Sequence, residues 1–214
     1  MKGMNKKVWL RVLYVIVGFT ILAIGLAFLR YAALGLDPYG TLIIGLTRQF
    51  DAPFGTVLLL VNLSMLVVVF FLDRRRIGFG TLYAMVVVGY TSDAVLWLIS
   101  AIPVFEQFSI GIRIVSFALG LPVLLFGVAI CIEANMGFTP YDMLGVIIAE
   151  KIKRPHWFRW IRICTDALCV ASGALLRSDI GAGTLLAVLL AGPLIAFFRK
   201  VLVKTKPFQI IQGN

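Results

Sequence analysis

Two stretches, Gly35-Leu36-Asp37-Pro38-Tyr39-Gly40 and Gly137-Phe138-Thr139-Pro140-Tyr141-Asp142, decide how this chain folds. In each, a glycine suited to ending a helix comes first, a residue suited to an N-cap (Asp37 or Thr139) follows, and a proline occupies the first helical position. An apolar segment of about 12 residues then follows, and at 1.5 Å per residue it makes a helix about 18 Å long. The pattern therefore predicts, twice, a break followed by a helix too short to cross a bilayer.

Long apolar segments lie on both sides of each break. A membrane-spanning helix needs about 20 mainly apolar residues, and five segments meet this requirement easily. A sixth segment, Trp157–Leu176, is weaker because it carries Arg159, Arg162 and Asp166. The sequence predicts an all-α membrane protein with six transmembrane helices, near residues 12–29, 52–72, 77–105, 114–132, 157–176 and 180–198.

The composition supports a membrane location. Of the 214 residues, 61% are hydrophobic and 14% are charged, whereas soluble domains average about 45–50% and about 25%. A core of this size cannot hide so much apolar surface from water. We therefore expect one membrane domain over residues 1–214 and exclude a soluble enzyme. The run from Val12 to Leu29 exceeds the 7–15 residues of a typical signal-peptide core and predicts an uncleaved first span.

The basic residues predict the orientation. If both termini are cytoplasmic, 16 of the 20 Lys and Arg residues fall on the inner side, as the positive-inside rule requires. Without the weak fifth span, the basic C-terminal tail would lie outside. The net charge of +10 therefore indicates contact between basic clusters and anionic lipid headgroups, and we do not expect a nucleic-acid partner.

The chain repeats its own plan. With an offset of 102 residues, Arg11 matches Arg113 and Tyr39 matches Tyr141, and with an offset of 103, Gly80-Thr81-Leu82 matches Gly183-Thr184-Leu185. The Gly and Pro matches reflect shared backbone geometry, and the Arg matches reflect a shared depth in the membrane. Two apolar stretches aligned by chance would match at Leu and Val instead. We predict pseudo-repeats at 11–101 and 113–200, each with three spans. Because three is odd, the second repeat is inverted relative to the first, an arrangement common in transporters, where the substrate site lies between the repeats.

Two interpretations of the short helices remain open. They either dip into the membrane from opposite faces, so that their positive N-terminal ends meet a solute or line a pore, or they lie on the surface and help the first spans to pack. The glycines of the Gly-x-Gly-Thr starts at Gly78 and Gly181 either allow close helix packing, which we favour, or line a site. The first interpretation of the short helices gives the predicted substrate-binding residues: Asp37, Pro38, Tyr39, Gly40, Glu133, Thr139, Pro140, Tyr141 and Asp142.

Acidic residues within the apolar segments are candidates for function because a charge in lipid is costly. We predict ion coupling at Asp93, Glu133 and Asp142, although Asp142 also suits the N-terminal dipole of its short helix. Asp166 lies four residues after Arg162, which favours a structural ion pair. Arg30 and Asp37 flank the first break and are close enough in the chain to pair.

Metal and cofactor chemistry is not expected. The three cysteines lie in apolar runs without a metal-binding spacing, and His156 is the only histidine. The chain has no nucleotide-binding motif and no visible nucleophile–base pair. We therefore predict no cofactor and no enzymatic activity.

The doubled pattern of Gly-x-x-Pro-Tyr followed by Ile-Gly-x-Gly-Thr-Leu resembles the YczE/YitT-type family of bacterial integral membrane proteins. The resemblance covers residues 11–200 and implies a location in the bacterial cytoplasmic membrane, without an agreed substrate. Family members often carry an Asp after the aromatic residue, as in Tyr141-Asp142, whereas Tyr39 is followed by Gly40.

Three functions fit these features. The first is a secondary transporter that moves a small solute, with coupling to protons or cations. The second is a passive channel, since two short helices entering from opposite faces also suit a pore. The third is a membrane accessory or assembly factor, which a structure without a polar interior would favour.

Overall fold

The computed structural model describes residues 2–102, 109–153 and 155–205, and these residues form only helices and their connections. The main helices are α1 (Lys2–Ala32), α2 (Pro38–Phe50), α3 (Phe54–Asp73), α4 (Phe79–Ser100), α6 (Ile110–Ala134), α7 (Pro140–Lys151), α8 (Phe158–Leu175) and α9 (Ala182–Val203), with short 3₁₀ helices η1 (Arg74–Arg76) and η2 (Pro155–Trp157).

Five of these helices, α1, α3, α4, α6 and α9, are long and apolar enough to cross a membrane. The predicted all-α membrane class is therefore confirmed. Helix α8 forms where the sixth span is expected and has 18 residues, but its charged side chains keep it outside this apolar group. The six-span arrangement stays a prediction.

Both short helices begin where local chemistry places them. The Asp37 carboxylate accepts a hydrogen bond from Gly40 N, and the Thr139 hydroxyl accepts one from Asp142 N. Gly35 and Gly137 precede these caps with φ values of +109° and +113°, a region that favours glycine. Helices α2 and α7 have 13 and 12 residues, so their predicted lengths are confirmed.

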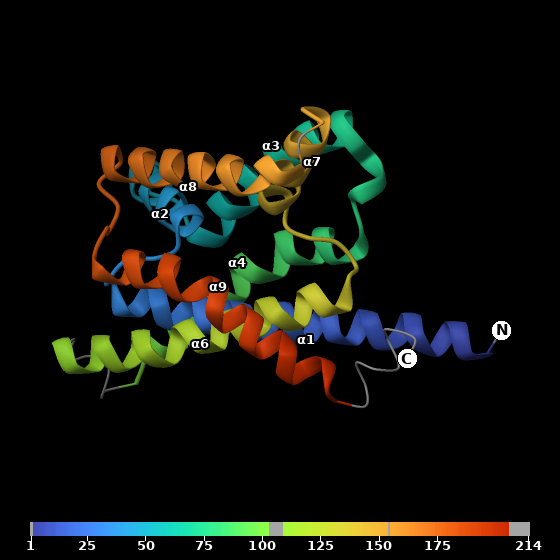
Figure 1. Ribbon diagram of the computed structural model, residues 1–214. Coiled ribbons are helices and arrows are strands. Elements are labelled where there is room, and N and C mark those ends of the chain that lie inside the picture. The colour runs from blue at the N-terminus through green and yellow to red at the C-terminus, as the bar shows by residue number, and fades with distance from the viewer. Residues whose placement is uncertain (1, 103–108, 154, 206–214) are drawn as a thin grey trace.

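The helices form two layers (Figure 1). Helices α1, α6 and α9 lie in one layer, helices α2, α3, α7 and α8 lie in the other, and α4 contacts both α1 and α3. The most extensive contact joins α1 and α6, and small residues allow it: a Cβ at Gly127 would lie 2.5 Å from Leu22 N. Close backbone approach of this kind is typical of packing between membrane helices.

The two sequence repeats contact each other through matching residues. Gly80 N, at the start of α4, donates to Met136 O, which lies in the break before α7. Gly183 N, at the start of α9, donates to Leu34 O in the break before α2. Each half of the chain therefore donates a backbone hydrogen bond to the break of the other half, with N···O distances of 2.9–3.0 Å. The Gly-x-Gly-Thr starts allow close packing between the halves, as the favoured interpretation expected, and Gly78 also lines a cavity.

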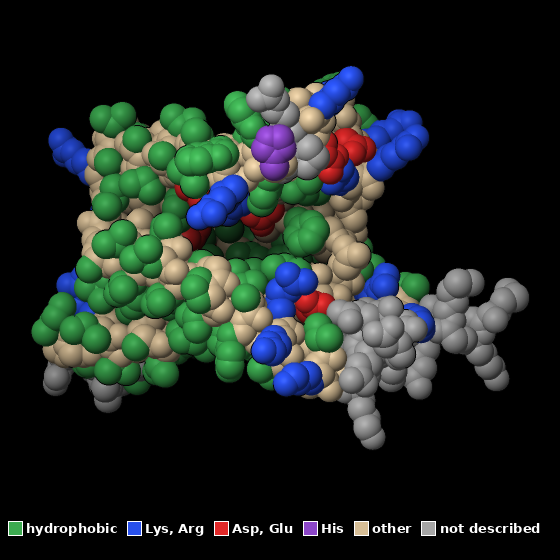
Figure 2. All heavy atoms as spheres, viewed as in Figure 1, with side chains coloured by type: hydrophobic (Ala, Val, Ile, Leu, Met, Phe, Trp, Pro, Cys, Tyr) green, Lys and Arg blue, Asp and Glu red, His purple; other side chains and the backbone are tan. Residues whose placement is uncertain are grey.

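The halves differ in how their last two helices pack. Helix α3 packs directly on α4, where a Cβ at Gly89 would lie 2.6 Å from Gly55 Cα. A Cβ at Gly192, the match of Gly89 in α9, would meet no atom of the described residues within 4 Å, and α8 packs instead on α2 and α7. Figure 2 shows the result as a hollow between α8 and α9, with acidic and basic side chains beside it.

Candidate functional site

The N-terminal ends of α2 and α7 meet through two tyrosines. The rings of Tyr39 and Tyr141 stack with centroids 4.5 Å apart and an angle of 10° between their planes. Each ring belongs to the residue directly after the proline of its break, so the matching positions of the two repeats touch. We call this contact the tyrosine pair, and it is the centre of the candidate site.

Each tyrosine hydroxyl is held by a polar side chain of the following helix. Tyr39 donates to Asn62 Oδ1 of α3 at 3.1 Å, and Tyr141 donates to Asp166 Oδ1 of α8 at 2.5 Å. The thiol of Cys169 also donates to the Tyr141 hydroxyl, over 3.7 Å. A buried hydroxyl without such partners would cost about 1–3 kcal/mol, so these bonds fix both rings in position.

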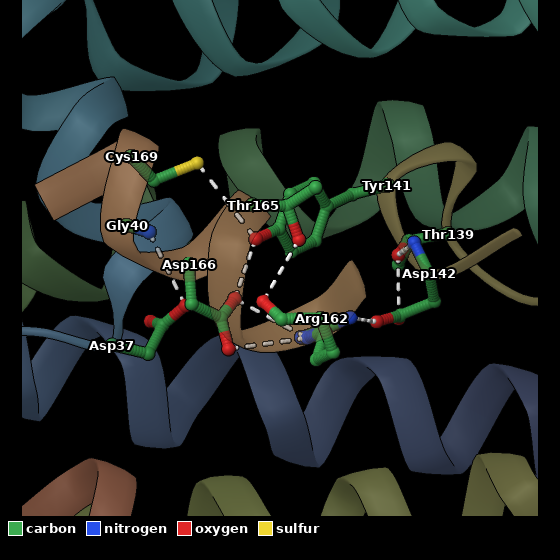
Figure 3. Close-up of polar contacts among 9 residues, drawn as sticks. All are labelled: Asp37, Gly40, Thr139, Tyr141, Asp142, Arg162, Thr165, Asp166 and Cys169. Atoms are coloured by element: carbon green, nitrogen blue, oxygen red, sulfur yellow. Dashed lines mark hydrogen bonds and ion pairs between the residues drawn. The ribbon is translucent and has the colours of Figure 1, made fainter. Parts of the chain in front are cut away.

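One guanidinium joins two carboxylates beside the tyrosine pair (Figure 3). Arg162 of α8 reaches Asp142 Oδ1 of α7 at 2.5 Å and Asp166 Oδ1 at 3.2 Å, and its Cζ lies 4.5 Å from the centroid of the Tyr141 ring. The expected pair of Arg162 with Asp166 is confirmed, but Arg162 also links α7 to α8. Asp142 accepts a further hydrogen bond from the Thr139 hydroxyl at 2.7 Å.

A third carboxylate, Asp37, lies on the other side of Arg162 and Asp166 (Figure 3). It accepts from Gly40 N at 3.2 Å and makes no ion pair within the described part of the chain. Asp37 belongs to the loop before α2, and burial raises the pKa of its carboxyl, although the hydrogen bond from Gly40 N and the charge of Arg162 act in the opposite direction. Three aspartates thus lie around one arginine, which pairs with two of them.

When all three carboxylates are ionised, their charge exceeds that of the one guanidinium, and such an excess favours a bound cation or proton. The carboxylates do not suggest a metal, because no group of three His, Cys, Asp or Glu residues in the described ranges is arranged to hold one. We refer to Asp37, Asp142, Asp166 and Arg162 together as the charged cluster.

Asp93 lies elsewhere, between α1, α3 and α4. Its carboxylate pairs with Arg30 at 2.8 Å and accepts from Gly55 N at 2.7 Å. Arg30 also donates to Ser92 and lies 3.9 Å from the centroid of the Phe54 ring. The expected pairing of Arg30 with Asp37 is therefore wrong, because helix packing brings Arg30 to Asp93 of α4 instead.

Glu133 lies near the end of α6 and has only 5% of its side chain exposed. It pairs with Arg199 of α9 at 2.6 Å, which ties these two helices together. Of the three predicted coupling acids, Asp142 joins the charged cluster, whereas Asp93 and Glu133 lie in ion pairs between helices. Their roles in coupling stay predictions.

The sequence prediction missed part of the site. Asn62 is buried with 4% exposure in the middle of apolar α3, and a lone amide in such a span was the available signal. Arg162 was predicted as an inner basic residue and as the partner of Asp166, but its contact with Asp142 was not predicted. Cys169 was expected only to lie in an apolar run. Residues 162, 166, 169 and 173 share one face of α8 at helical spacing, and this face points to the tyrosine pair.

The fold and the composition define a helical membrane protein with a polar site inside. The chain belongs to the family described as "Family of unknown function (DUF6198)", whose model matches residues 9–200. Two relatives from Bacillus subtilis (strain 168) carry the names "Uncharacterized protein YyaS" and "Uncharacterized membrane protein YczE". The first is 27% identical over 90% of this chain and 94% of its own, and the second is 24% identical over 91% and 87%. The resemblance to YczE is thereby confirmed, and no solved structure matches the chain.

Proposed function

We propose that the protein is a transporter that moves a small solute across the bacterial cytoplasmic membrane, coupled to protons or cations. The tyrosine pair carries this proposal: it brings the capped N-terminal ends of two matching short helices together beside the charged cluster. Short helices whose N-terminal ends meet between repeats are a feature of transporter binding sites. The polar interior argues against the accessory-factor alternative.

The proposal includes six spans in two inverted repeats, with α8 as the fifth span in chain order. The polar face of α8 supports this, because Arg162 and Asp166 point to Asp142 and Tyr141 of α7. Its other face carries Ile163, Leu168 and Leu175, which are exposed and suited to lipid. Charged residues within membrane spans are tolerated when they face the protein interior and pair there.

The charged cluster supplies a physical route to coupling. Arg162 neutralises part of the charge of Asp142 and Asp166, and Asp37 adds a carboxylate without an ion pair of its own among the described residues. A proton or a cationic group that binds to a carboxylate of the cluster removes its excess charge. Because Arg162 of α8 pairs with Asp142 of α7, protonation of Asp142 also weakens the link between these helices.

The unequal packing of the two halves supports a moving protein rather than a passive channel. Helices α3 and α4 are closely packed, whereas a hollow separates the matching α8 and α9 (Figure 2). Alternating access requires such a difference, with one side closed while the other is open. The stacked rings also fill the meeting point of the short helices, where a channel would need an open pore.

The test uses the purified protein in liposomes that contain a pH-sensitive dye. A panel of amines, amino acids and neutral solutes is added with and without an imposed pH gradient. We expect at least one solute to move protons, and we expect Asp37→Asn and Asp142→Asn to abolish this movement while Asp179→Asn, in an exposed ion pair with Arg48, preserves it. Solute uptake that ignores the gradient and both cluster substitutions would support the channel and overturn the coupled transporter.

A further inference from the structure

A cavity lies away from the tyrosine pair, where α1, η1 and the start of α4 meet the break before α7. Its volume is about 520 Å³. Three arginines line it, Arg11, Arg75 and Arg76, together with apolar side chains that include Val8, Phe79 and Phe138. We call this cavity the arginine pocket. Basic side chains gather at this end of the molecule, near the N-terminus of α1 (Figure 2).

The charged side chains in the lining of the arginine pocket are all basic. Its lining contains no Asp or Glu side chain among the described residues. Arg76 already pairs with two carboxylates, Asp73 and Glu150, and its Nε lies 2.9 Å from Asp73 Oδ2. Arg75 is exposed and its side chain makes no ion pair within the part of the chain that the structure describes. The pocket therefore offers at least one guanidinium to an anion.

We propose that the arginine pocket binds the phosphate group of an anionic phospholipid. Guanidinium groups match phosphate oxygens in a bidentate geometry, and basic pockets between membrane helices suit anionic lipid headgroups. The apolar lining, with Val8 on α1 and Phe79 on α4, decides between a lipid and a soluble phosphate, because it provides a wall for the glycerol and acyl carbons. The pocket also lies at the basic ends of its helices, at the depth where headgroups are found.

A lipid in this position would act on the contact between the repeats. The pocket wall includes Met136 and Phe138, whose carbonyl groups accept hydrogen bonds from Gly80 N and the Thr81 hydroxyl. The same segment leads into the Thr139 cap of α7. A bound headgroup would therefore stabilise the segment that positions α7, independently of whether the tyrosine pair binds a solute.

The experiment measures lipid binding to the full-length protein in a neutral detergent, by native mass spectrometry and by thermal unfolding. We expect phosphatidylglycerol to bind and to raise the unfolding temperature, and phosphatidylcholine to do neither. Arg75→Ala should weaken binding of phosphatidylglycerol by about tenfold, as the loss of one charge-assisted contact predicts. Because Arg75 is exposed, this variant should fold normally.

Arg74→Ala is the matched control. It removes the same charge from the same 3₁₀ helix, but Arg74 does not line the pocket. We expect its binding to stay within about twofold of the parent, since a surface charge contributes little. Equal weakening by both substitutions would show diffuse attraction to a basic surface and overturn the site. Equal stabilisation by inorganic phosphate or glycerol 3-phosphate would overturn the lipid as its ligand.

Discussion

The ring of Tyr39 lies flat against the ring of Tyr141, with the centroids 4.5 Å apart, although each belongs to a different half of the chain. This contact brings the starts of α2 and α7 together inside a protein whose five most apolar helices are long enough to cross a membrane. Both rings are also anchored at their hydroxyls, one by Asn62 and the other by Asp166. The stack is thus a fixed element that links the two halves.

The first prediction separates the rings from their hydroxyls. Tyr39→Phe and Tyr141→Phe keep the stack but remove the hydroxyl that donates to Asn62 or Asp166. Each should lower the free energy of unfolding by about 1–3 kcal/mol, with Tyr141→Phe at the lower end because Asp166 keeps its contact with Arg162. Tyr141→Ala also removes the ring and should cost about 3–5 kcal/mol, the range for losing a buried aromatic side chain. Thermal unfolding in detergent checks this order. An alanine variant as stable as the phenylalanine variant would show that the stack contributes little.

The second prediction concerns Asp93, which the sequence suggested as a coupling residue. Because its carboxylate holds both Arg30 and Gly55 N, Asp93→Asn should destabilise the protein by about 3 kcal/mol, through the partly buried Arg30 charge that it leaves behind. Arg30→Gln in the same chain should recover part of this loss. Unfolding of both single variants and the double variant measures the coupling. If Asp93→Asn folds with parental stability and abolishes proton movement, Asp93 is a coupling residue and not a structural one.

Local chemistry made the breaks predictable from sequence, whereas partners across the fold were not. Glycine, cap residue and proline act within a few positions, so the starts of α2 and α7 followed directly from Gly35-Leu36-Asp37-Pro38 and its match. The sequence match of Tyr39 with Tyr141 also predicted that these residues occupy equivalent positions in the two halves. Their contact, however, depends on how the two halves pack.

The ion pairs show why the rest of the site escaped prediction. Arg30 is close to Asp37 in sequence, but the packing of α1 against α4 places it beside Asp93, and the two residues form an ion pair. Arg162 and Asp166 followed from spacing on one helix, while the added contact of Arg162 with Asp142 requires α7 to lie beside α8. Asn62 carried a usable signal, since a buried amide within an apolar span needs a partner.

The third prediction tests the inverted six-span topology with single cysteines. Cys131, Cys164 and Cys169 are first replaced by alanine or serine, and a cysteine is then placed at Gly111, Lys153 or Asp179. In intact cells, an impermeant maleimide should label positions 111 and 179 from outside, but position 153 only after the membrane is opened. Position 111 lies at the start of α6 and position 179 lies after α8, so their labelling from the same outer side requires α8 to cross as well as α6. Labelling of 153 and 179 from the same side would exclude α8 as a span.

The final prediction uses two matching glycines to ask whether α8 approaches α9. A Cβ at Gly89 would lie 2.6 Å from Gly55 Cα, so Gly89→Ala must push α3 from α4 and should cost about 1–3 kcal/mol, as overpacking does. Gly192 has open space at the matching position of α9, so Gly192→Ala should leave stability unchanged or raise it by about 0.5–1 kcal/mol through helix propensity.

Transport then distinguishes a static hollow from a moving one. If α9 closes on α8 during the cycle as α4 closes on α3, Gly192→Ala slows solute-dependent proton movement in liposomes although the protein is as stable as the parent. Leu190→Ala, a change at an exposed site on the other side of α9, is the control and should leave the rate unchanged. A parental rate for Gly192→Ala would mean that the space beside Gly192 stays open throughout. The unequal packing of α3–α4 and α8–α9 would then be a permanent feature of the fold rather than one state of a cycle.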